Sequence, residues 1–425
     1  MSDQKYVRWL NAELPKLTGA GVVPADVAER IRAHYGAGGE GGGKRGAILV
    51  FSILGGALIG AGLILLLAHN WDEFGRPTRT VLSLLPLLVA QALAAFVIWR
   101  KSESGAWREG VGVFWVLAIG ASISLVAQTY HISGDLPAFL LTWTLAALPV
   151  VYLLNSSTAA MLFWVGATSW AGSLYWEAPG RGWFWVVAAL AVPHLWAVAR
   201  VDRYRPRVAW LLWTLGVCAA IGTGFGLDHY RGAVWVPVFT SYFAALYLIG
   251  ELWWGEGRTI WQRPLQTIGA LGVITLAVIL TFEDYWRHWA QRKEWLLLMK
   301  SPLLVMPAVA VGLWGWAWAR RNTVALLFGA LPVVTVAGRF VPGGLMVVAM
   351  NLYVLGLGVA LIGLGVRDRR LGVVNLGLLV VSVLIIARFF DSNMSIVVRA
   401  LAFIAVGVGF LVTNIVLIKR TREAQ

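Results

Sequence analysis

Fourteen apolar segments run through this chain, each long enough to form a helix that crosses a lipid bilayer. The hydrocarbon core of a bilayer is about 30 Å thick and requires about 20 apolar residues of helix. Short polar loops separate the segments, so the sequence predicts an all-α polytopic membrane protein with about 14 transmembrane helices. The segments lie at residues 46–69, 78–99, 110–129, 136–154, 157–175, 181–199, 207–227, 234–254, 264–282, 297–319, 322–340, 343–366, 370–390 and 396–418.

Lys and Arg residues alternate between the two sides of this predicted bundle. With a cytoplasmic N-terminus, 24 of the 35 Lys and Arg residues fall in cytoplasmic segments and 11 on the opposite side. The densest cytoplasmic loops are 200–207, 320–321 and 367–370. Basic residues are enriched in the cytoplasmic loops of membrane proteins. The alternation therefore predicts an even number of spans, with both termini in the cytoplasm.

The formal net charge of +14 does not indicate nucleic-acid binding in a chain of this kind. The charge is spread over short loops, where anionic head groups of the cytoplasmic leaflet are the nearest partners. We therefore expect membrane lipids as partners and no nucleic acid. The single cysteine, Cys218, lies inside an apolar segment and can form no intrachain disulfide. Residues 1–45 contain no apolar stretch of the kind found in a cleavable signal peptide.

The N-terminal segment is the only sizeable part expected outside the membrane. Apolar residues at helical spacing predict a cytoplasmic helical hairpin over residues 1–35, followed by a Gly-rich tether over 36–45. The transmembrane domain then covers 46–418, and 419–425 is a cytoplasmic tail. Because so short a hairpin lacks an ample core of its own, we expect it to dock on the membrane domain, on a second copy or on a partner protein.

Polar residues cluster at the predicted outer ends of four apolar segments. They follow the first segment at 69–73, the third at 128–135 and the thirteenth at 388–391, and a further Arg lies just inside the fourteenth. Charged groups near hydrocarbon are costly unless they are paired or hydrated. One interpretation is a shared outward-facing polar cavity that binds substrate, and the other is a set of helix caps and interfacial anchors. The candidate substrate-binding residues are Asn70, Trp71, Asp72, Gln128, His131, Asp135, Arg388, Asp391 and Arg399.

Proline and glycine interrupt several of the predicted spans. Prolines inside an apolar segment kink a helix or release backbone carbonyls, and kinks allow a cavity. Glycines on one helix face indicate close helix packing, as at Gly356, Gly358, Gly363 and Gly365. His194 is the main ionisable candidate at mid-depth, although a lone histidine there is more often a hydrogen-bonded packing residue. The internal prolines are Pro86, Pro193, Pro237, Pro307 and Pro332.

Two polar runs carry a family resemblance. Residues 66–73 read Leu-Leu-Ala-His-Asn-Trp-Asp-Glu, and residues 127–135 read Ala-Gln-Thr-Tyr-His-Ile-Ser-Gly-Asp. With the N-terminal hairpin, they resemble the bacterial membrane proteins grouped as domain of unknown function 2157, over roughly residues 1–175. The end of the chain, around 388–399, is similar to the related group numbered 4401. The resemblance implies a multi-pass protein of the bacterial cytoplasmic (inner) membrane, and a small membrane-anchored partner protein with a Gly-Asp-Tyr motif.

Three functions fit these observations. A transporter or flippase for a lipid-linked or small amphipathic solute accounts for the many spans, the interrupted helices and the polar residues on one side. A non-catalytic scaffold or sensor would act through the cytoplasmic hairpin. A membrane glycosyltransferase-like enzyme would use Asp72 as base and metal ligand, but its first outer loop is short. We favour the transporter, and the sequence assigns no catalytic residue, no metal site and no cofactor.

Overall fold

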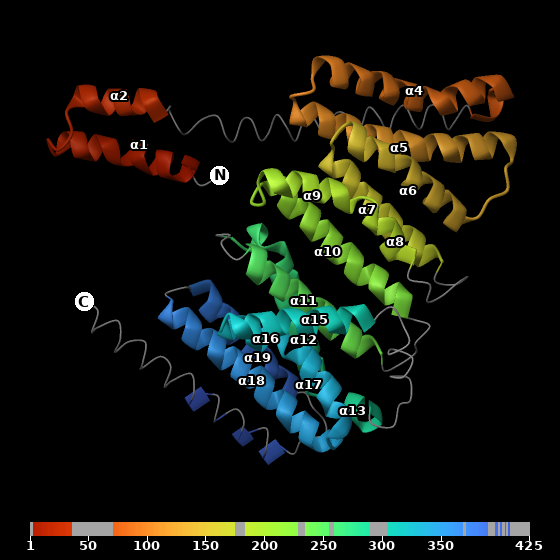
Figure 1. Ribbon diagram of the computed structural model, residues 1–425. Helices are drawn as coiled ribbons and strands as arrows, with labels where there is room; N and C mark the ends of the chain where they lie inside the picture. The colour runs from red at the N-terminus through yellow and green to blue at the C-terminus, as the bar shows by residue number, and fades with distance from the viewer. Residues whose placement is uncertain are drawn as a thin grey trace. The chain divides into compact units, whose positions relative to one another are not determined.

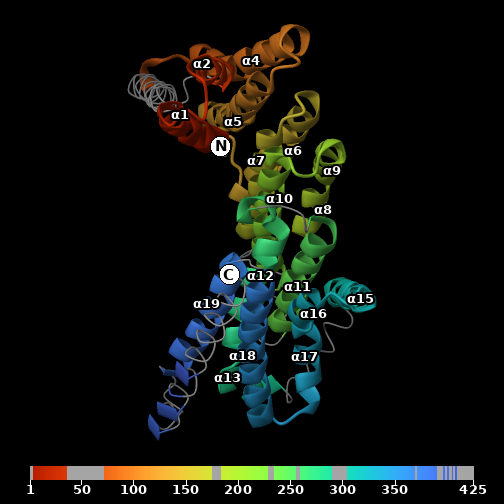
Figure 2. The same ribbon diagram turned by 90° about the vertical axis from the view of Figure 1, so that its left-hand side faces the viewer.

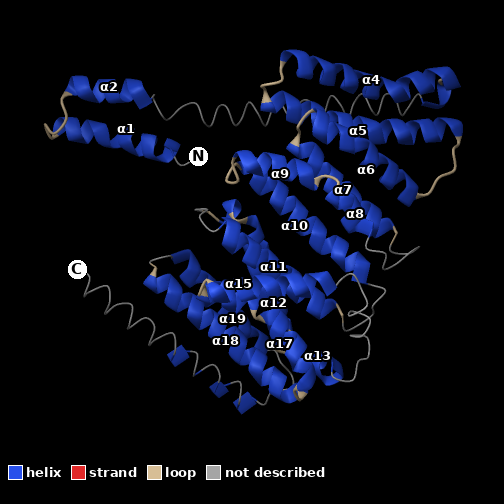
Figure 3. Cartoon of the chain, viewed as in Figure 1, coloured by secondary structure: helices blue, strands red, loops and turns tan. Residues whose placement is uncertain are grey.

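The computed structural model describes most of the chain. The described residues are 3–35, 71–174, 183–227, 234–254, 259–289, 304–368 and 371–389, with isolated positions between 396 and 408. Within these ranges the regular secondary structure is helical, and there is no strand (Figures 1 and 3). The prediction of an all-α chain is therefore confirmed for the described residues.

The helices follow one another with short connections. In the first half they are α1 (Asp3–Gly19), α2 (Ala25–Tyr35), η1 (Trp71–Glu73), α4 (Arg76–Arg100), α5 (Gly105–Tyr130), α6 (Leu136–Leu153), α7 (Ser157–Ser173), α8 (Trp183–Ala189), α9 (Val192–Val201) and α10 (Pro206–Leu227). In the second half they are α11 (Trp235–Trp254), η3 (Ile260–Gln262), α12 (Pro264–Ile279), α13 (Glu283–Trp289), α15 (Val305–Ala319), α16 (Thr323–Gly329), α17 (Leu331–Ala337), η5 (Gly338–Phe340), α18 (Gly343–Arg367) and α19 (Leu371–Phe389).

Seven of the described helices are long and apolar enough to cross a membrane by length and composition. The number rises to nine if each of two bent helix pairs, α8 with α9 and α16 with α17, is counted as one span. The predicted count of about 14 is not confirmed. Helix α12 has 16 residues, and at 1.5 Å per residue it is about 24 Å long, which falls short of a 30 Å core.

The predicted first and last spans, 46–69 and 396–418, lie outside the described residues except for isolated positions in the last one. The twelve predicted spans between them each coincide with a described helix or helix pair. Hydrophobic patterning therefore located helices well, but several of these helices are shorter or more bent than the apolar segments that contain them.

Residues 1–81 form a first compact unit. Its α1 and α2 pack antiparallel around Leu14 and Ala28, which are buried, and the turn between them places Gly21 at φ 70°. This positive φ favours glycine because a side chain would clash with the backbone. Two helices thus occupy the range in which a hairpin is predicted, and Trp9 on α1 remains 63% exposed.

Residues 82–425 form the second unit, and they contain two main apolar cores. The first core lies mainly among α4 to α10 and includes Tyr242 of α11 and Leu265 of α12; Phe163, Trp164 and Phe184 are almost fully buried in it. The second lies among α11 to α19, around Phe328 and Met350. Within this unit α6 packs on α7, α7 on α10, α11 on α12, and α18 on α19 (Figure 2).

Glycines allow two of these helix pairs to approach closely. A Cβ atom added to Gly269 of α12 would lie 2.4 Å from the backbone nitrogen of Tyr247 on α11. Likewise, a Cβ atom at Gly377 of α19 would lie 2.7 Å from the carbonyl oxygen of Gly358 on α18. The predicted packing role is therefore confirmed for Gly358, whereas Gly356 and Gly363 face open space.

Large apolar side chains cover the outside of the helices. On α4, Leu88 is 59% exposed and Trp99 is 83% exposed. Similar residues lie outward on α5, α10, α18 and α19. Soluble monomers rarely expose contiguous apolar patches of this extent. This surface is that of a protein whose helices face lipid, with tryptophans such as Trp99 and Trp318 at helix ends, where interfacial belts form.

Candidate functional site

Three of the predicted substrate-binding residues lie in the α5–α6 turn or on the last turn of α5 before it. His131 ends α5 in the left-handed conformation, with φ 50°. Asp135 begins α6 and accepts a hydrogen bond from the backbone N–H of Ala138 at 2.6 Å. Gln128 lies exposed on the last turn of α5. His131 and Asp135 therefore act as helix caps in this structure, as the second interpretation of the polar residues expects.

Arg388 lies elsewhere in the second unit, at the end of α19. Its Nη2 donates to the hydroxyl of Thr281 at 2.9 Å, and its guanidinium stacks 4.3 Å from the ring centre of Phe282. Helix α19 packs on α18 and α12, whereas α5 packs on α6 and α7. The structure thus brings Arg388 to the end of α12, where Asn351 also donates to the carbonyl of Thr281.

The remaining predicted site residues are described in part or not at all. Trp71 is buried in η1, and the guanidinium of Arg79 lies 6.0 Å from its ring centre. Asp72 follows in the same turn, and its side chain lies outside the description. Asn70, Asp391 and Arg399 also lie outside the described residues. The single site shared by all clusters stays a prediction.

A break between α8 and α9 is the first of two interrupted spans. The two helices meet at an angle of 43°. Pro193 stands at the start of α9, where its ring and missing N–H prevent a continuous helix. The carbonyls next to the break are not left open, because the indole N–H of Trp164 donates to Ala188 at 3.0 Å and the hydroxyl of Tyr152 donates to Leu190.

A break between α16 and α17 is built in the same way. This pair bends by 40°, and Pro332 stands at the start of α17. The indole N–H of Trp314 donates to the carbonyl of Leu326 at 3.0 Å, and the hydroxyl of Tyr353 donates to that of Leu327 at 2.6 Å. In both cases a Trp and a Tyr from neighbouring helices bind carbonyls near the proline. Such partners keep an interrupted helix stable in hydrocarbon.

His194 lies in the first turn of α9, directly after the first break. It is only 3% exposed, and its Nε2 has no hydrogen-bond partner among the described residues. Its ring stands edge-on to that of Tyr152, with 6.3 Å between the ring centres. A buried polar atom without a partner costs about 1–3 kcal/mol. His194 is therefore not the fully hydrogen-bonded packing residue that is commonest at such positions.

Glu109 is the centre of a polar network that was not predicted from the sequence. Its carboxylate accepts hydrogen bonds from the hydroxyls of Ser156 (2.8 Å) and Thr158 (2.7 Å) and from the backbone N–H of Ser157 (3.1 Å) and Thr158 (2.8 Å). It also forms an ion pair with Arg207 at 3.0 Å. The network joins the start of α5, the α6–α7 turn and the start of α10.

A second carboxylate joins three elements of the second core. Glu251, on the last turn of α11, accepts from the side-chain amide of Asn322 at 3.2 Å and from that of Gln266 on α12. Asn322 in turn caps α16 by accepting from the backbone N–H of Ala325 at 3.1 Å. A charged residue inside an apolar segment is the signal that could have identified Glu251 from the sequence.

The two networks share a local design. In each, a residue in the left-handed conformation ends one helix, at Asn155 (φ 47°) or Arg321 (φ 52°). The next residue, Ser156 or Asn322, caps the following helix and also donates to a glutamate from elsewhere in the fold. Each network therefore joins several helix ends, all of which lie on the side that the sequence predicts to be cytoplasmic.

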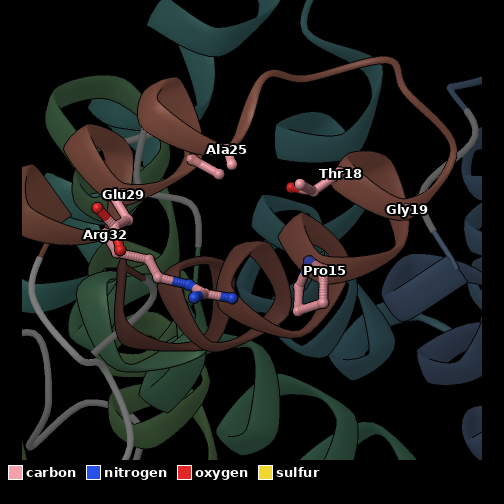
Figure 4. Close-up of a pocket in the computed structure, with 7 residues that line it drawn as sticks. Pro15, Thr18, Gly19, Ala25, Glu29 and Arg32 are labelled. Carbon is pink, nitrogen blue, oxygen red and sulfur yellow. The ribbon is translucent and has the colours of Figure 1, made fainter.

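A hollow between α1 and α2 is a separate feature of the first unit (Figure 4). It lies where the two short helices converge, and its polar groups are the hydroxyl of Thr18 and the charged ends of Glu29 and Arg32. The hollow is open rather than enclosed. The remaining lining residues are Pro15, Gly19, Ala25 and Ala28.

The exposed apolar helices indicate a membrane protein, and a comparison with known families agrees. Residues 15–160 match the family model described as Predicted membrane protein (DUF2157). This match confirms the resemblance carried by the two polar runs. The DUF2157 match covers the end of α1, all of α2 and η1, α4 to α6, and the beginning of α7, so it includes Glu109, Ser156 and the capped turn at His131 and Asp135. No curated protein and no solved structure matches the chain.

Proposed function

We propose that the protein is a carrier or flippase of the bacterial cytoplasmic membrane that moves a lipid-linked or small amphipathic solute. The observation that carries this proposal is the pair of interrupted helices, one in each apolar core. Discontinuous helices with proline at the break are the elements around which many transporters bind solute and rock between two states. Helices that only anchor a protein in the membrane do not need two broken spans, each with hydrogen bonds from a Trp and a Tyr of neighbouring helices.

The proposal includes 14 spans, with both termini in the cytoplasm. Its outward-facing polar residues, which include Gln128, Asp135 and Arg388, would be the first to meet the solute. The guanidinium of Arg388 stacks on an aromatic ring and donates to a neutral hydroxyl. A cationic group held in this way is suited to binding an anionic head group that is later released. The Glu109 and Glu251 networks would then hold the opposite, cytoplasmic, ends of the helices in fixed groups that move as rigid bodies.

Cysteine labelling tests the orientation. We expect a single cysteine at Gly134, in a Cys218→Ala background, to react with a membrane-impermeant thiol reagent added to intact cells. A cysteine at Ser102 should react only after the membrane is permeabilised, because Ser102 and Gly134 flank opposite ends of α5 and both are exposed. Labelling in the reverse order would show that the termini lie on the side opposite to the cytoplasm.

A reconstitution experiment tests the carrier itself. The purified protein is placed in vesicles that contain a fluorescent phospholipid, and a reductant that cannot cross the membrane bleaches the outer leaflet. Wild-type protein should expose inner-leaflet lipid to bleaching. Pro332→Ala should slow this transfer at least tenfold by straightening the α16–α17 break. A tenfold change corresponds to about 1.4 kcal/mol in the barrier.

The matched control is Pro149→Ala, since Pro149 lies exposed within the unbroken helix α6. It should leave the transfer rate unchanged. Equal rates with wild-type protein, with either proline variant and with empty vesicles would remove the flippase proposal for phospholipids.

The scaffold or sensor remains the second candidate, and the hairpin favours it. Trp9 and Val22 are 63% and 68% exposed on a two-helix unit with a hollow, which is a surface suited to a small partner protein. Deletion of residues 1–35 distinguishes the two functions. A carrier should keep its transfer activity in vesicles, whereas a scaffold should lose its cellular phenotype while the membrane domain accumulates normally.

A further inference from the structure

His194 combines features that no structural role in the fold explains. It is buried, its Nε2 has no partner among the described residues, and it follows a helix break directly. The neighbouring Tyr152 stabilises the break between α8 and α9, because its hydroxyl donates to the carbonyl of Leu190. Protonation of the imidazole therefore acts on the side chain, Tyr152, whose hydrogen bond lies at the break between α8 and α9.

Two opposite charges act on this imidazole. Arg207 and Glu109, which form an ion pair with each other at 3.0 Å, are both close enough to interact electrostatically with His194. The other elements packed on α9 add little: α8 has no titratable residue, and α10 adds only Cys218. On α9 itself, Arg200 stacks on Trp196 at 5.0 Å. A proton on His194 would be repelled by Arg207 and attracted by Glu109.

We propose that His194 is a proton-binding residue that changes the bend between α8 and α9. The neutral imidazole takes one proton from water at its unprotonated nitrogen and releases it in the reverse step, so no other reactant is needed. The imidazolium then competes with Arg207 for Glu109 and displaces the ring of Tyr152, which weakens the bond to Leu190. This inference rests on the proposed carrier function, in which that bend couples a proton to movement of the solute.

Spin labels across the break test the proposal without a transport assay. Cysteines replace Trp183 and Val201, which are 50% and 69% exposed at the far ends of α8 and α9, in the Cys218→Ala protein. The distance between the labels should change between about pH 8 and about pH 3, a range wide enough to charge an imidazole that burial keeps neutral. His194→Gln, which can hydrogen-bond but not carry charge, should abolish the change, and His34→Gln in the N-terminal hairpin should preserve it.

Tyr152→Phe provides a second variant in case His194→Gln fails to fold. It removes only the hydroxyl and should hold the labels at their low-pH distance at both pH values. A pH-dependent change that persists in His194→Gln, or a wild-type distance that does not respond to pH, would overturn the proposal.

Lipid transfer in the same vesicles separates this inference from the carrier proposal. Transfer that requires a pH gradient in wild-type protein but not in His194→Gln supports both. Transfer without any pH dependence keeps the carrier and overturns the proton coupling. A distance that titrates through His194 in a protein that transfers no lipid keeps the proton-binding residue and removes the flippase.

Discussion

Glu109→Ala is expected to lower the free energy of unfolding by about 3 kcal/mol and to deplete the protein from the membrane. The change leaves Arg207 without its ion-pair partner at a site where its side chain is only 33% exposed, and it removes the acceptor for the backbone N–H groups of Ser157 and Thr158. Removing one partner of a buried pair costs about 3–5 kcal/mol, and the partial exposure here places the loss at the lower end. Unfolding in mixed detergent micelles, followed by circular dichroism, measures it.

The same carboxylate can be tested with a double-mutant cycle. Glu109→Gln combined with Arg207→Gln should recover part of the stability that each single change loses, with a coupling energy of about 1–3 kcal/mol. Glu103→Ala is the matched control, because Glu103 lies exposed in the loop before α5. If Glu109→Ala were as mild as Glu103→Ala, the network would be a surface feature and would not join α5, α7 and α10.

Gly269→Ala should be destabilising although alanine is the better helix former. The added methyl would lie 2.4 Å from the nitrogen of Tyr247 and 2.6 Å from the carbonyl oxygen of Phe243, both backbone atoms of α11 that cannot turn away. Overpacking typically costs 1–3 kcal/mol, and we expect at least about 3 kcal/mol here, since two helices must separate.

Gly312→Ala on α15 is the control for this change, because no atom lies within 4 Å of an added methyl there. It should stabilise the protein by up to about 1 kcal/mol through helix propensity alone. Thermal unfolding of the two variants in the same detergent should therefore move in opposite directions. A loss of stability in both would mean that the α11–α12 contact is looser than its glycine suggests.

The positions of helices could be read from the sequence because hydrophobicity is a local property. Each apolar segment between 78 and 390 contains a helix or a helix pair. Residue types that cap helices, Asp135 and Asn322, directly precede α6 and α16 in the sequence. The number of spans could not be read in the same way. Hydropathy counts apolar residues, but it does not report where a helix bends, as α8 with α9 and α16 with α17 do, or where it ends early, as α12 does.

Proline in the sequence did not distinguish a kink from a break. Pro86 and Pro149 lie within continuous helices, whereas Pro193 and Pro332 begin new ones. The difference lies in the neighbours, since at each break a tryptophan from another helix, Trp164 or Trp314, donates to a carbonyl near the proline.

The sequence by itself determined that this chain is helical, apolar on its outer surface and built for a membrane, because those properties follow from the order of hydrophobic and basic residues. Only the tertiary structure decided which polar groups meet. Glu109 lies about 50 residues from Ser156 and about 100 from Arg207, and no spacing rule links them. They come together because α5 and α10 both pack on α7, which brings the start of α5 and the start of α10 to the α6–α7 turn.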